Sequence, residues 1–142
     1  MKVSISCDAD WEAKIDKVVY ALSDLNYRRF FEERHYGSSL ESILIGLMCQ
    51  DPELNLKRRI RYTKKEKQLS LDIMLDINQF KQIDQRERNK IVIDKILSEV
   101  IPIIKKYKFE DFDTPKFEDD FNKFFIKCAR KLEKLAITSK KP

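Results

Sequence analysis

Several residue types that carry specific chemistry are scarce in this chain of 142 residues. Its two glycines, Gly37 and Gly46, exclude glycine-rich phosphate loops and dinucleotide fingerprints, because those motifs need several glycines for close backbone approach. The one histidine, His35, has no cysteine or carboxylate at a recognisable catalytic spacing. No apolar run is long enough for a signal peptide or a membrane span, so we expect no membrane association. The residues alone therefore mark no catalytic constellation.

The three cysteines, Cys7, Cys49 and Cys128, are widely separated and odd in number. With no CxxC pair and one histidine, a structural zinc site is not expected. Their neighbours are mostly apolar. We interpret them as buried free thiols, which suits a cytoplasmic protein in a reducing compartment.

Charge is abundant and uneven. Charged residues make up 37% of the chain and the net charge is +5. Residues 57–67 hold seven basic residues and one acid, whereas residues 110–120 hold six acids and one base. A chain of this length and an apolar content of 42% predict one globular domain over residues 1–142.

Residues 54–77 predict a β-hairpin around the charged turn Lys64–Lys67. Apolar and polar residues alternate on both sides of this turn, so one face of the hairpin can be buried while the other stays exposed. A four-residue turn would place Arg59 opposite Asp72 on the exposed face. We expect a cross-strand charge pair there rather than paired catalytic carboxylates.

Residues 40–50 fit two structures. Ser38 and Glu41 have the spacing of a capping box before a helical stripe, whereas the short apolar run 43–49 is typical of a buried strand. Periodicity does not separate the two. We adopt the strand, because it completes a meander of strands at residues 42–50, 54–63 and 67–77.

Three helices are expected from apolar residues at helical spacing, at residues 9–25, 85–107 and 115–136. Asp84 and Glu87 form a second capping box, Pro102 predicts a kink or break, and Thr114 offers a capping hydroxyl. Residues 1–6 alternate as a short strand, and residues 137–142 are expected to fray. The predicted fold is a two-layer α+β domain with a four-stranded, mostly antiparallel sheet packed by three helices.

Aromatic and basic residues interleave between residues 26 and 39. Aromatic side chains among arginines can stack on the bases of a nucleic acid. We favour the alternative that these aromatics reach into the core from a helix end and a loop. They are Tyr27, Phe30, Phe31 and Tyr36.

The basic hairpin is the first candidate functional surface. Its cluster would attract phosphate backbones or an acidic protein partner, and charges of this kind also keep exposed strands from pairing edge to edge. The sequence leaves these three roles open. The candidate residues are Arg59, Arg61, Lys64, Lys65, Lys67 and Asp72, with Lys57 beside them.

The acidic connector before the last helix is the second candidate. Glu118, Asp119 and Asp120 fall in the first turns of that helix, where negative charge favours the helix dipole. The dipole does not explain Glu110, Asp111 and Asp113. A loop rich in carboxylates could mimic phosphates and occupy the active site of a basic nuclease.

Three stretches together resemble small immunity proteins of bacterial polymorphic toxin systems. They are CQDPELNLKRRIRYTKKEKQLSLDIMLDINQF, QRERNKIVIDKIL and KYKFEDFDTPKFEDDF, and the likeness spans residues 44–125. Such proteins are cytoplasmic α+β inhibitors encoded beside a secreted toxin, which they neutralise by direct binding. The resemblance implies no enzyme activity, no cofactor, and a cognate toxin as partner. By family prevalence, that toxin would act on nucleic acids.

The alternative function is a small nucleic-acid-binding or regulatory module that uses the basic hairpin, residues 57–67. Binding of that kind would weaken steeply as salt rises, whereas a packed protein interface would lose far less affinity.

Overall fold

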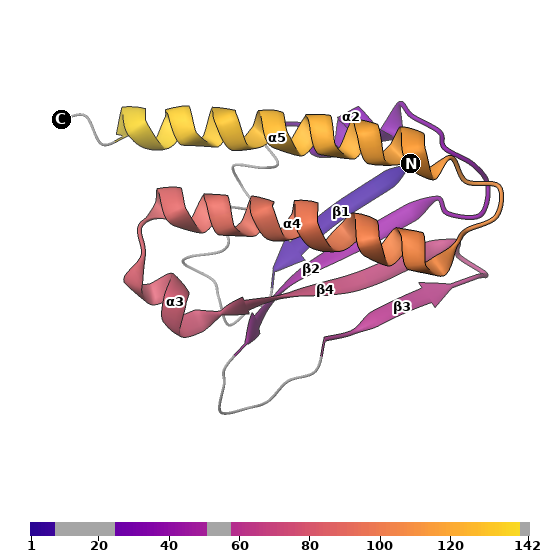
Figure 1. The fold of residues 1–142 in the computed structure, drawn as a ribbon, viewed down its shortest axis with the longest axis horizontal. Coiled ribbons are helices and arrows are strands. Elements are labelled where there is room, and N and C mark those ends of the chain that lie inside the picture. Colours follow the sequence, from indigo (N-terminus) through magenta and orange to yellow (C-terminus); the bar gives the residue numbers. More distant parts are fainter. Residues whose placement is uncertain (8–24, 51–57, 140–142) are drawn as a thin grey trace.

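The computed structural model describes residues 1–7, 25–50 and 58–139 (Figure 1). The expected helix at residues 9–25 lies almost entirely outside this described part. In chain order the elements are β1 (Lys2–Cys7), α2 (Tyr27–Glu32), β2 (Ser42–Gln50), β3 (Ile60–Thr63), β4 (Gln68–Asp76), α3 (Ile77–Gln82), α4 (Gln85–Tyr107) and α5 (Thr114–Ser139).

The four strands form one mixed sheet in the order β1-β2-β4-β3. β2 runs parallel to both of its neighbours, pairing Ile43 with Val3 on one side and with Leu69 on the other. Of the strand pairs in the described residues, only β3 and β4 are antiparallel, with Ile60 opposite Leu71. Residues 42–50 are thus a strand, as expected, and the hairpin forms around a turn at residues 64–67.

The predicted antiparallel meander is wrong. It would place β3 beside β2 and leave β4 at the edge, whereas β4 lies between them. Alternate residues of β4 from Leu69 to Leu75 are buried, while Arg59 and Arg61 are exposed. An apolar strand gains most from neighbours on both sides, and charged side chains suit an edge.

Two layers make up the fold, which confirms the α+β class. α4 and α5 lie side by side over one face of the sheet (Figure 1). The core between the layers buries alternate strand residues against the inner faces of these helices. Its members include Val3, Ile5, Ile43, Ile45, Leu69, Leu71, Ile93, Ile96, Phe117, Phe121 and Phe125.

Helix α4 matches its predicted bounds, and its N-cap is also as expected. The Asp84 carboxylate accepts a hydrogen bond from the Glu87 backbone N–H at 2.9 Å. Of the predicted kink or break, the break is not seen: the helix runs without interruption through Pro102, which is exposed. α5 begins one residue earlier than predicted and continues to Ser139, into the segment expected to fray.

Two short helices were not predicted. β4 ends at Asp76 because the carboxylate of Asp76 accepts hydrogen bonds from Asn78 and Gln79 and starts α3. α2 covers part of the aromatic stretch after residue 26, and its buried side chains are Tyr27 and Phe31. The core role favoured for these aromatics is therefore confirmed.

Candidate functional site

The structure divides the predicted site residues between two places. The hairpin turn, with Lys64, Lys65 and Lys67, lies at the same end of the molecule as the acidic connector (Figure 1). Arg59 and Asp72 lie further along the β3–β4 ladder, away from that end. We call the surface formed by residues 38–41, 64–67 and 108–111 the hairpin end.

Residues 38–41 join the turn to the connector. The Glu41 backbone N–H donates to the Lys67 carbonyl at 2.9 Å, and the two side chains form an ion pair at 3.7 Å. The Ser39 hydroxyl donates to the Glu110 carbonyl, and the Ser39 carbonyl accepts from the Tyr62 hydroxyl. One segment therefore fixes the position of both predicted charge clusters.

Asp111 holds the connector to this segment. Its backbone has a φ of 47°, and its carboxylate accepts hydrogen bonds from the Ser38 hydroxyl and, at 3.3 Å, from the Ser38 backbone N–H. These bonds lower the pKa of the Asp111 carboxyl, and the nearby charges of His35 and Lys67 act in the same direction. The Asp111 carboxylate is thus already engaged within the chain.

Asp113 has a structural role as well. Its carboxylate accepts a hydrogen bond from the Lys116 backbone N–H at 3.1 Å, and its carbonyl accepts from Phe117 at 3.0 Å. Asp113 therefore caps α5, a role we had expected for the Thr114 hydroxyl. The third acid of the connector, Glu110, is exposed, and its carboxylate takes no part in the contacts described above.

Asp72 and Arg59 face each other as the hairpin register predicts, but the Asp72 carboxylate binds the backbone of Arg59 rather than its guanidinium. The Asp72 carboxylate accepts from the Arg59 backbone N–H at 3.2 Å, and the Asp72 N–H donates to the Arg59 carbonyl at 2.9 Å. A Cβ on Gly46 would lie 3.0 Å from the Asp72 carboxylate, so the glycine makes room for it. This site holds the end of β3 to the sheet.

Sequence reasoning missed an apolar groove between β3 and α4. The groove has a volume of about 650 Å³. Two of the three large hydrophobic side chains that are most exposed in the described part line it, Ile60 at 40% and Tyr107 at 39%. We call this the β3–α4 groove; its lining residues are Arg58, Ile60, Ser98, Glu99, Pro102, Ile103, Lys106 and Tyr107.

An aromatic cluster forms one end of this groove. The rings of Tyr107 and Phe109 stack with centroids 5.4 Å apart, and Phe109 packs edge-on against Tyr62 at 4.8 Å. Two aromatics at the end of a helical stripe were the only sequence sign of this cluster. Their meeting with Tyr62 depends on β3 being the edge strand, which the predicted meander did not allow.

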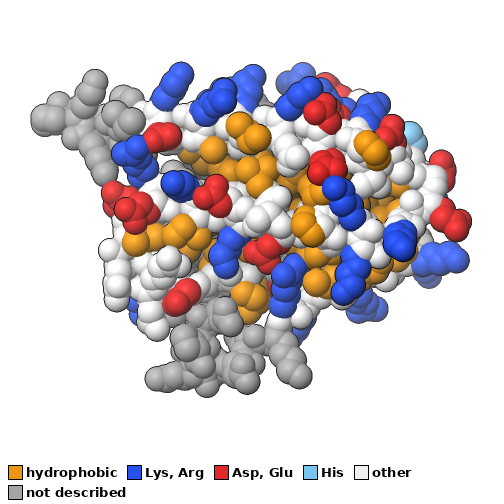
Figure 2. All heavy atoms as spheres, viewed as in Figure 1, with side chains coloured by type: hydrophobic (Ala, Val, Ile, Leu, Met, Phe, Trp, Pro, Cys, Tyr) orange, Lys and Arg blue, Asp and Glu red, His pale blue; other side chains and the backbone are white. Residues whose placement is uncertain are grey.

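Basic side chains lie in the groove, at Arg58 and Lys106, and on the strand and turn beside it. Figure 2 shows Lys and Arg gathered over the end of α4 and the adjoining edge of the sheet, with hydrophobic side chains between them. Arg58 forms an ion pair with Glu99 at 2.8 Å, while Arg61, Lys64, Lys65 and Lys106 are exposed.

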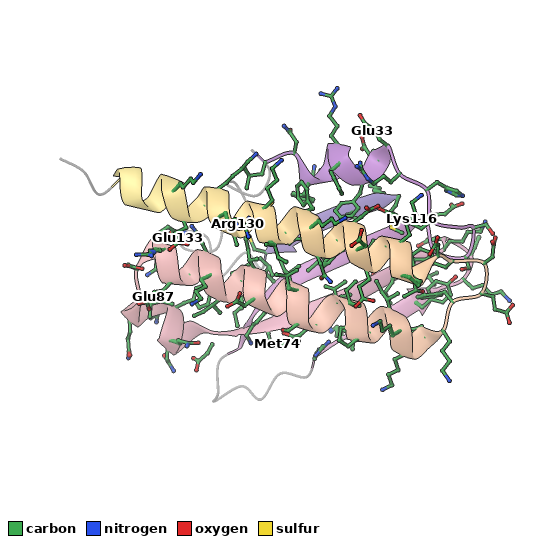
Figure 3. The ribbon with its side chains drawn as sticks, turned by 45° about the horizontal axis from the view of Figure 1, so that its top comes forward. Glu33, Met74, Glu87, Lys116, Arg130 and Glu133 are labelled. Atoms are coloured by element: carbon green, nitrogen blue, oxygen red, sulfur yellow. The ribbon has the colours of Figure 1, made fainter. Side chains whose placement is uncertain are left out.

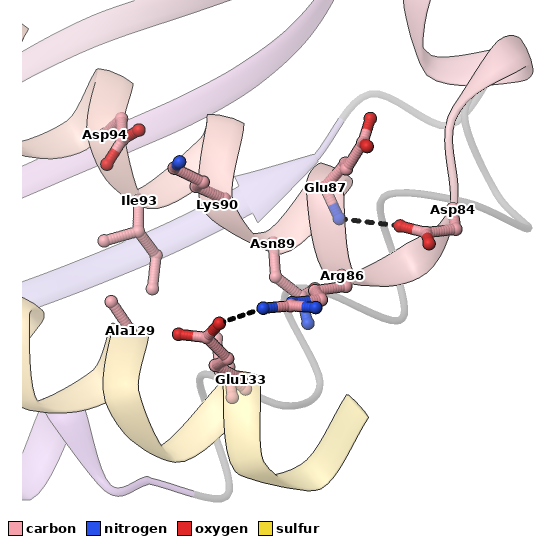
Figure 4. Close-up of a pocket in the computed structure, with 10 residues that line it drawn as sticks. Asp84, Arg86, Glu87, Asn89, Lys90, Ile93, Asp94, Ala129 and Glu133 are labelled. Carbon is pink, nitrogen blue, oxygen red and sulfur yellow. Dashed lines mark hydrogen bonds and ion pairs between the residues drawn. The ribbon is translucent and has the colours of Figure 1, made fainter. Parts of the chain in front are cut away.

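A second hollow lies between the start of α4 and the end of α5 (Figure 4). Part of its charged lining is engaged within the chain: the Arg86 guanidinium pairs with Glu133, and the Asp84 carboxylate accepts from the Glu87 backbone N–H. Figure 3 shows Glu87 and Glu133 at one end of the helical layer and Lys116, beside the connector, towards the other. The Arg86–Glu133 pair thus serves the packing of the two helices.

A third hollow lies between α2 and α5, beside the buried Cys128. Burial raises the pKa of the Cys128 thiol to about 11, which keeps it protonated at neutral pH. Three lysines line this hollow: Lys123, Lys127 and Lys131. Lys123 is paired with Asp119 at 2.9 Å.

Neither a metal site nor a membrane span is found in the described residues. No group of three or more His, Cys, Asp or Glu in residues 1–7, 25–50 and 58–139 could hold a metal ion. No helix of that part is long and apolar enough to cross a membrane.

The fold and its surfaces define a small α+β protein with an exposed apolar groove inside a charged rim, a combination typical of surfaces that bind other proteins. The sequence model of one family, Immunity protein 44, matches residues 1–127. The chain belongs to this family, which supports a toxin-neutralising immunity role. No curated protein and no solved structure matches the chain.

Proposed function

We propose that the protein is an inhibitor rather than an enzyme, and that it neutralises one bacterial toxin by binding it directly in the cytoplasm. The match to the Immunity protein 44 family over residues 1–127 is the observation that carries this proposal. The surface chemistry supports it, since exposed aromatic and apolar side chains within a polar rim are the usual anchors of tight protein interfaces.

We further propose that this toxin acts on nucleic acids. An enzyme of that kind often holds its metal ions through carboxylates within a basic groove, so its site carries both signs of charge. The hairpin end also carries both, with Lys64 and Lys65 exposed in the turn and Glu110 exposed in the adjacent connector. Such a surface can oppose both parts of the toxin's site.

Co-expression with the product of the neighbouring toxin gene tests the inhibitor role. We expect the cells to survive and the two proteins to co-purify as a one-to-one complex. A toxic neighbour that is neither bound nor neutralised would overturn the proposal.

Adding the purified protein to the purified toxin, with labelled DNA and RNA as substrates, then tests the toxin class. Inhibition at a molar ratio of one is expected, and a toxin that degrades neither substrate would refute this part alone.

Charge variants test the place of contact. Glu110→Lys at the hairpin end should weaken the complex. Its matched control is Glu33→Lys at the C-cap of α2, where the side chain is also exposed and a surface pair with Arg29 is lost. Equal effects of the two variants would show that the connector is not part of the interface.

Direct nucleic-acid binding is the second candidate function, favoured by the exposed Arg61, Lys64 and Lys65. It predicts binding of a labelled single strand at low salt, and a loss of affinity of several orders of magnitude at physiological salt. Fluorescence anisotropy with the wild-type protein measures both. No binding at about 50 mM salt would exclude this candidate.

A further inference from the structure

The outer edge of β3 is open in the described part of the chain, since the sheet ends there. The Arg59–Asp72 pair is linked by a backbone hydrogen bond. Because such bonds alternate along an antiparallel ladder, the backbone groups of Arg61 and Thr63 also point to β4. The N–H and C=O groups of Ile60 and Tyr62 therefore point away from β4, towards the open edge.

This edge adjoins the β3–α4 groove. Ile60 and Tyr62 lie opposite the buried Leu71 and Leu69, so their side chains are on the face of the sheet that α4 covers. Ile60 lines the groove, and Tyr62 meets the Tyr107–Phe109 stack at its end. A strand added to β3 would thus find backbone partners and, beside them, an apolar groove for alternate side chains.

Charge determines which strand fits. Residues 58–67 hold six basic side chains and one acid. A second copy of this chain would bring the same positive edge against the first, and like charges directly opposite one another disfavour that pairing. An acidic segment would be attracted instead, and its encounter with the edge would be accelerated.

We propose that the open edge of β3 and the β3–α4 groove bind an extended, acidic segment of the cognate toxin, which adds a fifth strand to the sheet. This proposal rests on the inhibitor function proposed above. The pleat also sets the pattern of the segment: apolar residues should face Ile60 and Tyr107, and should alternate with Asp or Glu facing Arg61.

Amide hydrogen exchange of the complex with the purified toxin is the direct test. In the free protein the amides of Ile60 and Tyr62 should exchange quickly, while those of Arg61 and Thr63 should be protected by β4. In the complex the amides of Ile60 and Tyr62 should become protected. A complex in which these two amides still exchange quickly would overturn the proposal.

A backbone variant separates the edge from the side chains. Ile60→Pro removes an N–H that points away from β4, so the β3–β4 ladder should persist. Binding should fall by at least about tenfold, whereas Ile60→Val, which keeps the amide, should stay within about threefold of wild type. Equal affinities of the two variants would refute strand addition, and circular dichroism confirms that both are folded.

Side-chain variants test the groove and its charge. Tyr107→Ala should weaken binding by at least about tenfold, while Ile126→Ala, which removes a side chain 45% exposed on α5, should not. Arg61→Glu should slow association more than Arg130→Glu, an exposed position on α5 (Figure 3). Equal losses of affinity for Tyr107→Ala and Ile126→Ala, or equal association rates for Arg61→Glu and Arg130→Glu, would contradict the proposal.

The outcomes also separate this proposal from the function beneath it. If the toxin binds neither the wild-type protein nor any variant, the inhibitor function itself is refuted. A tight wild-type complex that none of the β3 and Tyr107 variants weakens would leave that function intact and refute only the docking site. A dimer of this chain that Ile60→Pro breaks, measured by light scattering, would assign the edge to a second copy instead.

Discussion

Replacing Gly37 by alanine should destabilise the protein far more than the same change at Gly46. Gly37 has a φ of 148°, which L side chains rarely adopt, and a Cβ there would lie 1.9 Å from the Asp111 carbonyl oxygen. The two segments meet at this point: the Ser38 N–H donates to the Asp111 carbonyl at 3.0 Å, and the Asp113 N–H donates to the Tyr36 carbonyl. An alanine must push them apart.

The magnitude follows from these contacts. Backbone strain of this kind costs about 1–3 kcal/mol, and the two hydrogen bonds contribute about 1 kcal/mol each, so the loss should be about 3–5 kcal/mol. At Gly46 a Cβ would lie 3.0 Å from the Asp72 carboxylate, the far end of a side chain. The Gly46→Ala variant should therefore stay within about 1 kcal/mol of wild type.

Urea denaturation followed by circular dichroism measures both variants. With an m-value of about 2 kcal/mol/M, the midpoint of Gly37→Ala should fall by roughly 1.5–2.5 M. A midpoint within about 0.5 M of wild type would show that the connector does not press against Gly37 as the structure describes. A Gly46→Ala variant that is equally destabilised would show that the cost belongs to glycine in general.

Three further predictions concern single side chains. The pKa of Asp111 is lowered on folding, so its contribution to stability is present above the ordinary aspartate pKa of about 3.9 and is lost as pH falls through the lower folded value. The urea midpoints of wild type and Asp111→Asn should thus differ at about pH 6 and approach each other as the pH falls through the folded pKa. With the other two cysteines replaced by serine, the buried Cys128 should react with a thiol reagent only as fast as the protein unfolds, and rapid reaction of the native protein would contradict its placement. Tyr36→Phe should cost about 1–3 kcal/mol, because the Tyr36 hydroxyl donates to the Asp120 carboxylate at 2.7 Å; a calorimetric melting temperature equal to wild type would refute that bond's role.

The sequence predicted a helix or strand well where a single local feature, such as a cap or a turn, determines its bounds. The Asp84 cap and the apolar stripe of α4 set bounds that the structure confirms, and the charged turn at Lys64–Lys67 set the hairpin. Strand order was not available from such patterns. Whether β2 pairs with β3 or with β4 depends on contacts between distant residues, and alternation along β4 is compatible with either neighbour.

The candidate site shows the same division. Sequence reasoning identified the charges at the hairpin and the connector, and the structure brings Lys67 and Asp111 to one end of the molecule. It could not anticipate that Asp111 binds Ser38 or that Asp113 caps α5, because both contacts depend on the path of the loop. Alternation along the hairpin places Ile60 on the apolar face, but an edge strand leaves part of that face exposed.

The insertion of β4 between β2 and β3 also determines how freely the surface can change. Among the described strands β3 has one neighbour, β4, to which a four-residue turn joins it, so the hairpin is a local unit that can form before β4 docks on β2. Substitutions on the outer side of β3 disturb no pairing in the rest of the sheet. The residues that stabilise the fold are thereby separate from those on the outer side of β3. The latter can change the binding specificity at little cost in stability.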